Sequence, residues 1–354
     1  MGNRLKEYNF PLNTYKGLFA VFIMVNHLGL NIVNFADVNT INYLIVDAFF
    51  VISGYLLMVG IDGKRKKVSI KDYLLKRMKR IYPQYLFGIV SVLFLIALRP
   101  YVWNERGLTL LSVFEELFML QQAALSVNLL NGPDWYISAW IFSTLVWLIV
   151  YKWGGMKGVV GVATMTFLEY TIWVVNNGYM SGIVRPFLLL GGLTRAICVM
   201  GVGMLTHYWC TIIYEKVDDS STLLMRFTKS GNFLEIILVV LFLITLKLST
   251  AFPTIDIILL LIIALLITLS NVDTFFNRCL KSKWIQCLGN WSMYLYLSHV
   301  PADLVHRYLL EGFGGRFGKL CVVFFFMIAS KYIPNMLIMI LKKQHFCRIT
   351  NNKI

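Results

Sequence analysis

Charged residues are scarce in this sequence. Only 14% of its 354 residues are Asp, Glu, Lys or Arg, whereas 58% are apolar. An ordinary soluble domain carries about 25% charged residues. With a mean hydropathy of +0.68, the chain lacks the polar surface that a water-soluble globule needs. The composition therefore excludes a soluble enzyme, a disordered protein and a typical nucleic-acid binder, and it predicts a polytopic membrane protein.

Disulfide, metal-site and repeat patterns are lacking as well. The chain has six cysteines, and their spacing matches no zinc finger. We predict no metal site and no external disulfide. No internal repeat is evident, and the first apolar run lacks the small-residue cleavage site of a signal peptide. No soluble domain is expected beyond the last apolar segment.

Long apolar segments dominate what is present. A helix needs about 20 mainly apolar residues to cross a bilayer, and ten segments meet this condition. They are residues 15–34, 41–61, 83–98, 135–151, 158–176, 186–209, 233–249, 255–272, 290–311 and 319–341. We therefore expect an all-α membrane protein with about ten transmembrane helices.

The basic residues predict the topology. With the N-terminus inside, 23 Lys and Arg residues fall in cytoplasmic segments and 7 in outer segments, as the positive-inside rule requires. Both termini are therefore predicted to be cytoplasmic, with a basic cytoplasmic loop at 62–82 and an outer loop at 99–134. The net charge of +15 lies in short blocks between apolar runs, which favours lipid headgroups or a phosphorylated substrate over nucleic acid.

Polar residues at membrane depth mark candidate functional positions, because a buried charge costs at least ~2.5–3.5 kcal/mol on insertion scales. His27 is the sharpest of them. Lys16 precedes it by 11 residues, and 11 steps of 100° return to within about 20° of the same helix face. A neutral imidazole there can act as a general base. The alternative is a histidine that only satisfies a neighbouring backbone carbonyl.

Other ionisable and small residues fall within the predicted spans. Asp47 lies at a depth from which it can orient the histidine, or it can pair with a Lys or Arg for packing alone. Ser53 and the glycine that follows it suit a close approach of two helices. Glu169 and Arg195 fall at similar depths on successive spans, which predicts a buried ion pair between them.

The loop at 62–82 carries the densest charge. Lys76 shares a helix face with Arg80, and so does Arg77. Such a block can be a topology signal that binds anionic lipid, or it can hold phosphates, which arginine binds bidentately. We expect the helix that carries this block to end near Pro83, where the third span begins.

Several of these segments, in this order, resemble the motifs of the bacterial membrane acyltransferase 3 family. The first is a basic residue, ten further residues and a histidine, matched by Lys16 and His27, with Lys where the family usually has Arg. The second is VDLFFVLSGFLI, which is similar to residues 46–57. The third is R-x-x-R followed by a proline, matched by the arginines at 77 and 80 ahead of Pro83.

Two later segments complete the resemblance. The family's LG-x-x-S-x-x-x-YL-x-H is similar to residues 288–299, which include Ser292 and His299. Residues 131–140 (NGPDWYISAW) resemble the Trp-containing start of the family's fourth span, with Trp140 where many relatives have Glu. The matches run from about residue 12 to residue 301.

The resemblance implies a single acyltransferase domain over residues 1–354, in the inner membrane of a bacterium. It implies transfer of an acetyl group from cytoplasmic acetyl-CoA to a hydroxyl of an extracytoplasmic glycan or lipid-linked sugar, with His27 as general base or as transient acyl carrier. The implied catalytic residues are His27, Lys16 and Asp47. The implied CoA-binding residues are Lys76, Arg77, Lys79 and Arg80. Residues expected to line or support the path are Ser53, Glu169, Arg195, Ser292 and His299.

A second function fits the same architecture. Some relatives are proposed exporters of polysaccharide, and polar spans suit transport too. Transporters usually show internal repeats, and the sequence has none that is evident. A transporter would tolerate loss of His27 better than an enzyme would.

Overall fold

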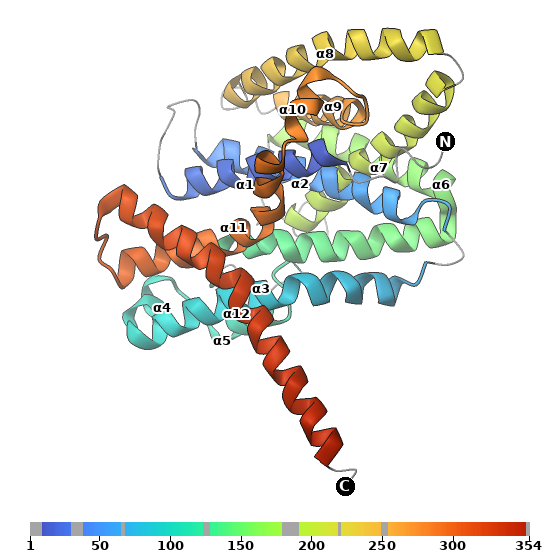
Figure 1. The fold of residues 1–354 in the computed structure, drawn as a ribbon. Coiled ribbons are helices and arrows are strands. Elements are labelled where there is room, and N and C mark those ends of the chain that lie inside the picture. Colours follow the sequence, from blue (N-terminus) through green and yellow to red (C-terminus); the bar gives the residue numbers. More distant parts are fainter. Residues whose placement is uncertain are drawn as a thin grey trace. The chain divides into compact units, whose positions relative to one another are not determined.

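The computed structural model describes residues 9–29, 38–64, 68–122, 128–178, 191–218, 221–248 and 254–351. These residues form twelve α-helices and one short 3-10 helix, and no strand occurs among them (Figure 1). The helices are α1 (Phe10–His27), α2 (Val38–Ile61), α3 (Ile70–Leu98), α4 (Tyr101–Glu105), α5 (Leu110–Leu117), α6 (Trp135–Asn177), α7 (Gly191–Asp218), α8 (Ser221–Leu248), α9 (Ile255–Leu269), α10 (Phe275–Leu280), α11 (Lys283–Tyr308) and α12 (Gly315–Asn351); the 3-10 helix η3 is Gly132–Asp134.

The apolar helices confirm the expected fold class. Among the residues that the structure describes, six helices are long and apolar enough to cross a membrane: α2, α3, α6, α7, α8 and α12. The very apolar α9 has 15 residues and is shorter. Each of the ten predicted segments overlaps a helix within the described residues, although α1 and α11 carry more polar residues than the six. The chain is an all-α polytopic membrane protein.

Two predicted helix boundaries are wrong. The first span was expected to continue to residue 34, but α1 ends at His27, and residues 30–37 lie outside the described part. The basic block was expected to end a helix near Pro83, but α3 runs without a break from Ile70 to Leu98 with Pro83 inside it. The basic residues therefore form the first turns of the same helix that continues into the apolar segment.

The fourth and fifth predicted spans form one helical run, α6, broken at Gly155. This residue has φ 60° and ψ −156°, a backbone conformation that is essentially open only to glycine. The break replaces the short loop that the sequence suggested between the two spans. The exposed Lys152 and Lys157 lie on either side of it.

The chain divides into two compact units. Unit 1 comprises residues 1–74, 122–124 and 135–292, and unit 2 comprises residues 75–121, 125–134 and 293–354. In unit 1, α7 packs directly on α2: a Cβ atom at Gly54 would overlap the carbonyl oxygen of Met200, and one at Gly203 would overlap that of Val51. The close helix approach predicted at residues 53–54 is confirmed.

Candidate active site

The first helix carries the predicted Lys16–His27 stripe. α1 is helical throughout this stretch, so the two side chains lie on one face as expected. Between them on that face, Ala20 and Ile23 are each only 1% exposed. Lys16 is half-buried, whereas His27 is exposed and is the last residue of the helix. The stripe therefore runs along a buried helix face and ends in an accessible imidazole.

Polar groups and glycines join α1 to the start of α11. Asn13 Nδ2 donates to Gln286 Oε1 at 3.1 Å and to Asn290 Oδ1 at 3.1 Å. A Cβ atom at Gly17 would lie 2.6 Å from the backbone nitrogen of Gly289, so the two helices meet backbone to backbone. The contact brings the residue after Lys16 against the late motif, and it explains why the motif's Leu-Gly pair needs glycine.

A buried ion pair joins α2 to α7. Asp47 Oδ1 lies 2.6 Å from Arg195 Nε, and the two side chains are only 1% and 2% exposed. Arg195 also donates to the carbonyl of Tyr43 and lies over that residue's ring, 5.0 Å from its centroid. The Tyr43 hydroxyl in turn donates to the buried carboxylate of Asp256 on α9. Of the two roles expected for Asp47, pairing with an arginine is the one that these contacts show.

The ion pair predicted between Glu169 and Arg195 is wrong. Arg195 is satisfied by Asp47, and Glu169 lies on an exposed face of α6. Depth in the membrane was the only criterion behind that prediction. Depth does not fix the direction in which a side chain leaves its helix.

Three other predicted residues have local contacts. Ser53 Oγ lies 3.4 Å from the hydroxyl of Tyr136 in unit 1, and Ser292 Oγ donates to the carbonyl of Gly289 one turn earlier. In unit 2, His299 is fully buried, and its Nδ1 lies 2.7 Å from the carbonyl oxygen of Tyr296. These contacts fix the rotamers of the three side chains, and their functional roles stay predictions.

The predicted phosphate-binding residues share the first turns of α3. Lys76, Lys79 and Arg80 are exposed, and Arg77 is half-buried. All four belong to unit 2, whereas Lys16, His27 and Asp47 belong to unit 1. Since α3 is unbroken, the four cations are held in fixed register with each other on a rigid helix, a geometry that suits a multiply charged anion.

Sequence reasoning missed a buried acidic cluster in unit 2. Glu116 on α5 is 0% exposed, and its Oε1 accepts the backbone N–H of Asn131 at 3.0 Å. The side chain of Asn131 donates to Asp134 Oδ1 at 2.9 Å. Burial raises the pKa of Glu116 from 4.5 to about 8, although the N–H donors and nearby Arg106 oppose this shift. The cluster lies in the segment interpreted as an outer loop, where no periodic pattern pointed to burial.

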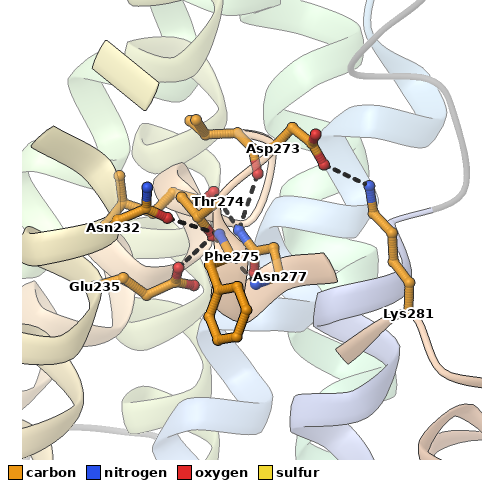
Figure 2. Close-up of polar contacts among 9 residues, drawn as sticks. Asn232, Glu235, Asp273, Thr274, Phe275, Asn277 and Lys281 are labelled. Atoms are coloured by element: carbon orange, nitrogen blue, oxygen red, sulfur yellow. Dashed lines mark hydrogen bonds and ion pairs between the residues drawn. The ribbon is translucent and has the colours of Figure 1, made fainter. Parts of the chain in front are cut away.

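A second missed carboxylate, Glu235 on α8, joins that helix to α10 (Figure 2). It is fully buried and accepts hydrogen bonds from the hydroxyls of Thr274 and Tyr15. Asn232, one turn earlier on α8, accepts the backbone N–H of Phe275 at 2.6 Å. The Asn232 bond satisfies a backbone N–H in the first turn of α10, and the Glu235 bonds hold the threonine that caps this helix. We therefore interpret this cluster as a structural anchor.

The whole-chain comparison decides the family. A family model described as an acyltransferase domain, acyltransferase 3, matches residues 12–336. The chain belongs to the acyltransferase 3 family. No curated protein and no solved structure matches it. The matched stretch includes every residue predicted to be catalytic or CoA-binding.

The acyltransferase thus presents two groups of functional candidates. One is the exposed imidazole at the end of α1, which can accept a proton from a hydroxyl. The other is the basic start of α3, which can bind phosphate. Within the described residues, no cluster of three or more His, Cys, Asp or Glu side chains is placed to hold a metal ion.

Proposed function

We propose that this membrane acyltransferase is an O-acetyltransferase of the bacterial inner membrane. It takes the acetyl group from cytoplasmic acetyl-CoA and delivers it to a hydroxyl of an extracytoplasmic or lipid-linked glycan. The observation that carries the proposal is the family match over residues 12–336, combined with a block of cations at the start of a membrane helix.

The donor site follows from the charge on α3. CoA carries a pyrophosphate and a ribose phosphate, and Arg77 and Arg80 lie one turn apart on the helix that carries the block. Hydrogen bonds between charged groups contribute roughly 1.5–3 kcal/mol each. A basic block that served only as a topology signal would not need two arginines one helical turn apart.

His27 supplies the chemistry. The acceptor hydroxyl attacks the thioester carbonyl carbon while the imidazole takes the hydroxyl proton. The C–S bond then breaks, the acetyl group stays on the acceptor oxygen, and the CoA sulfur leaves as a thiolate that recovers the proton. The position of His27 at the exposed end of α1 leaves room for an acceptor, and Lys16 anchors the other end of the stripe.

The test is glycan acetylation in cells, measured by mass spectrometry at matched protein levels. We expect His27→Ala to abolish acetylation without affecting membrane insertion, because α1 ends at this residue and its side chain is exposed. Asn26→Ala, one residue earlier, is the matched control and should retain activity. Wild-type acetylation by His27→Ala would remove this residue from the mechanism and would favour the transport function.

The donor site has its own test, in vesicles whose cytoplasmic face is accessible. Replacing Arg77 and Arg80 together by Ala should raise the apparent KM for acetyl-CoA at least about tenfold, since a decade corresponds to ~1.4 kcal/mol. The control removes two other exposed cations, Lys152 and Lys157, with Ala. An unchanged KM in the arginine variant would show that the donor binds elsewhere and that the block is a topology signal.

A further inference from the structure

The segment between α3 and α6 does not stay at one end of unit 2. Next to the end of α3, Arg99 pairs with Glu311 at 3.5 Å, and the hydroxyl of Tyr308 donates to Glu105 at 2.8 Å. These contacts place α4 level with the end of α11 and the turn that follows it. In Figure 1 α4 and α5 lie beside α3.

Beyond α4 the chain turns back along α3. The hydroxyl of Tyr82 donates to the carbonyl of Leu117 at 3.0 Å, and that of Tyr85 donates to the carbonyl of Glu116 at 2.6 Å. Tyr82 lies 16 residues before Leu98, the last residue of α3. At ~1.5 Å per residue, the end of α5 is therefore about 24 Å back along the helix.

Contacts with α11 show independently how far the chain turns back. The hydroxyl of Tyr296 donates to the carbonyl of Pro133 at 2.8 Å, and Asn131 Nδ2 donates to the carbonyl of Leu297 at 3.3 Å. Leu297 and Tyr296 lie 11 and 12 residues before Tyr308, the end of α11. This is about 17 Å back along that helix, in the same direction that α3 indicates.

The segment that leads back to α6 runs next to the segment that follows α4. Arg106 Nη2 donates to the carbonyl of Leu129, and Asn128 Nδ2 donates to the carbonyl of Gly107, both at 2.9 Å. Residues 106–121 and 128–134 thus form two arms, which we call the hairpin. One end of the hairpin lies at the ends of α3 and α11, and the rest lies alongside the bodies of these helices.

The hairpin is anchored at a site built for it. Pro301 lacks the N–H that would otherwise bond to the Leu297 carbonyl, and Asn131 takes that place. On α3, a Cβ atom at Gly88 would lie 3.2 Å from the same carbonyl oxygen and 3.5 Å from Asn131 Nδ2. Irregular backbone at membrane depth is tolerated when protein groups satisfy it in this way.

The faces of α5 are inverted relative to a helix on a water-exposed surface. Its polar side chains Ser112 and Glu116 are fully buried, whereas Leu110 is 82% exposed and Phe114 52%. Phe118, the residue after α5, is 62% exposed. A soluble protein places such residues the other way round. One side of the membrane helix α3 shows the same character, because Val90, Phe94 and Leu98 are exposed at successive turns.

We propose that the hairpin re-enters the membrane from the face at which α3 ends, with Leu110, Phe114 and Phe118 against lipid acyl chains. The occupant of this surface is the bilayer hydrocarbon, because α5 lies beside α3 and the exposed side chains of both helices are apolar. The proposal concerns only the hairpin and does not depend on the donor, the acceptor or the catalytic role of His27.

The test compares four phenylalanines in turn, each replaced by p-acetylphenylalanine and labelled with a hydroxylamine nitroxide in proteoliposomes. Positions 114 and 118 report on the hairpin. Position 94 on α3 is the lipid control, and position 313, 82% exposed in the turn before α12, is the aqueous control. Electron paramagnetic resonance measures collisions with oxygen, which concentrates in hydrocarbon, and with a nickel chelate, which stays in water.

We expect the oxygen-to-nickel collision ratio at positions 114 and 118 to match that at position 94 and to exceed that at position 313 several-fold. Ratios equal to the aqueous control would place the hairpin outside the membrane. Protection from both reagents would show that protein, such as a second copy of the chain, covers this face. Either of these results overturns the proposal. Labelling does not interfere with the cysteines, because the chemistry is selective for the ketone.

Discussion

Asp47 in unit 1 and Glu116 in unit 2 are both fully buried carboxyl groups, and the protein accommodates them differently. Asp47 lies 2.6 Å from a guanidinium that is itself buried. Glu116 accepts the N–H of Asn131 and has a raised pKa. The first carboxyl group thus has a buried countercharge beside it, whereas burial favours the protonated form of the second. An ion pair fixes two helices rigidly, and a protonated acid leaves its segment sensitive to pH.

The largest effect should come from breaking the ion pair on one side. Replacing Arg195 by Gln leaves Asp47 buried without its countercharge, which typically costs about 3–5 kcal/mol. We expect a large fall in the unfolding free energy, measured by denaturant titration in detergent micelles. Wild-type stability in this variant would show that Asp47 does not depend on Arg195.

A double variant sharpens the same comparison. Asp47→Asn with Arg195→Gln removes both charges and should recover much of the lost stability, because no lone charge remains buried. Its acyl-transfer rate then separates packing from catalysis. Retained activity would show that Asp47 acts only as the partner of Arg195, and loss of activity in a stable protein would support the catalytic role.

A smaller effect is expected at the crossing that holds this pair. Gly203→Ala forces a Cβ atom into the Val51 carbonyl, and such overpacking costs typically about 1–3 kcal/mol. Gly161→Ala is the control, since nothing lies within 4 Å of that Cβ position. It should leave stability unchanged or raise it by roughly 0.5–1 kcal/mol, because alanine favours the helix. Equal thermal shifts in the two variants would contradict the close α2–α7 contact.

The smallest effect concerns the proton on Glu116. Its pKa is raised from 4.5 to about 8 on folding, so the folded protein binds the proton more tightly than the unfolded chain. The contribution to stability is complete below pH 4.5 and is lost as the pH rises through 8. We therefore expect the free energy of unfolding to fall as the pH rises from 6 to 9.

Glu116→Gln should weaken this pH dependence, because the amide oxygen can still accept the N–H of Asn131 and carries no titratable proton. The neighbouring carboxyl of Asp134, whose pKa burial also raises, can still titrate in this variant. The measurement is thermal unfolding of both proteins over pH 6 to 9. Parallel curves for the two proteins would show that Glu116 does not titrate in this range.

Hydropathy predicted the helices, because length and apolar content are local properties. Gly54 was predicted as a contact site for the same reason, since a small residue in an apolar helix has few other uses. The partner of Arg195 was not predictable, because two acids lay at suitable depths and the choice depends on the rotation of each helix.

The hairpin lay further beyond sequence reasoning. Its anchors join residues far apart in the chain, such as Asn131 and Leu297, which are 166 positions apart. Glu116 and Asp134 stood in a segment with two arginines and short helices, which has the composition of a loop. Only Pro301 gave a signal, since a proline within a helix frees a carbonyl that something must satisfy.

The crossing of α1 and α11 has a consequence for how the protein is made. Asn13 on the first helix bonds to Gln286, 273 residues later. At about 5–20 residues per second of synthesis, the first helix waits roughly 14–55 s for this partner. During that time the buried amide of Asn13 needs another hydrogen-bonding partner. The translocation machinery, a neighbouring helix or the lipid headgroup region must therefore shelter α1 before the fold is complete.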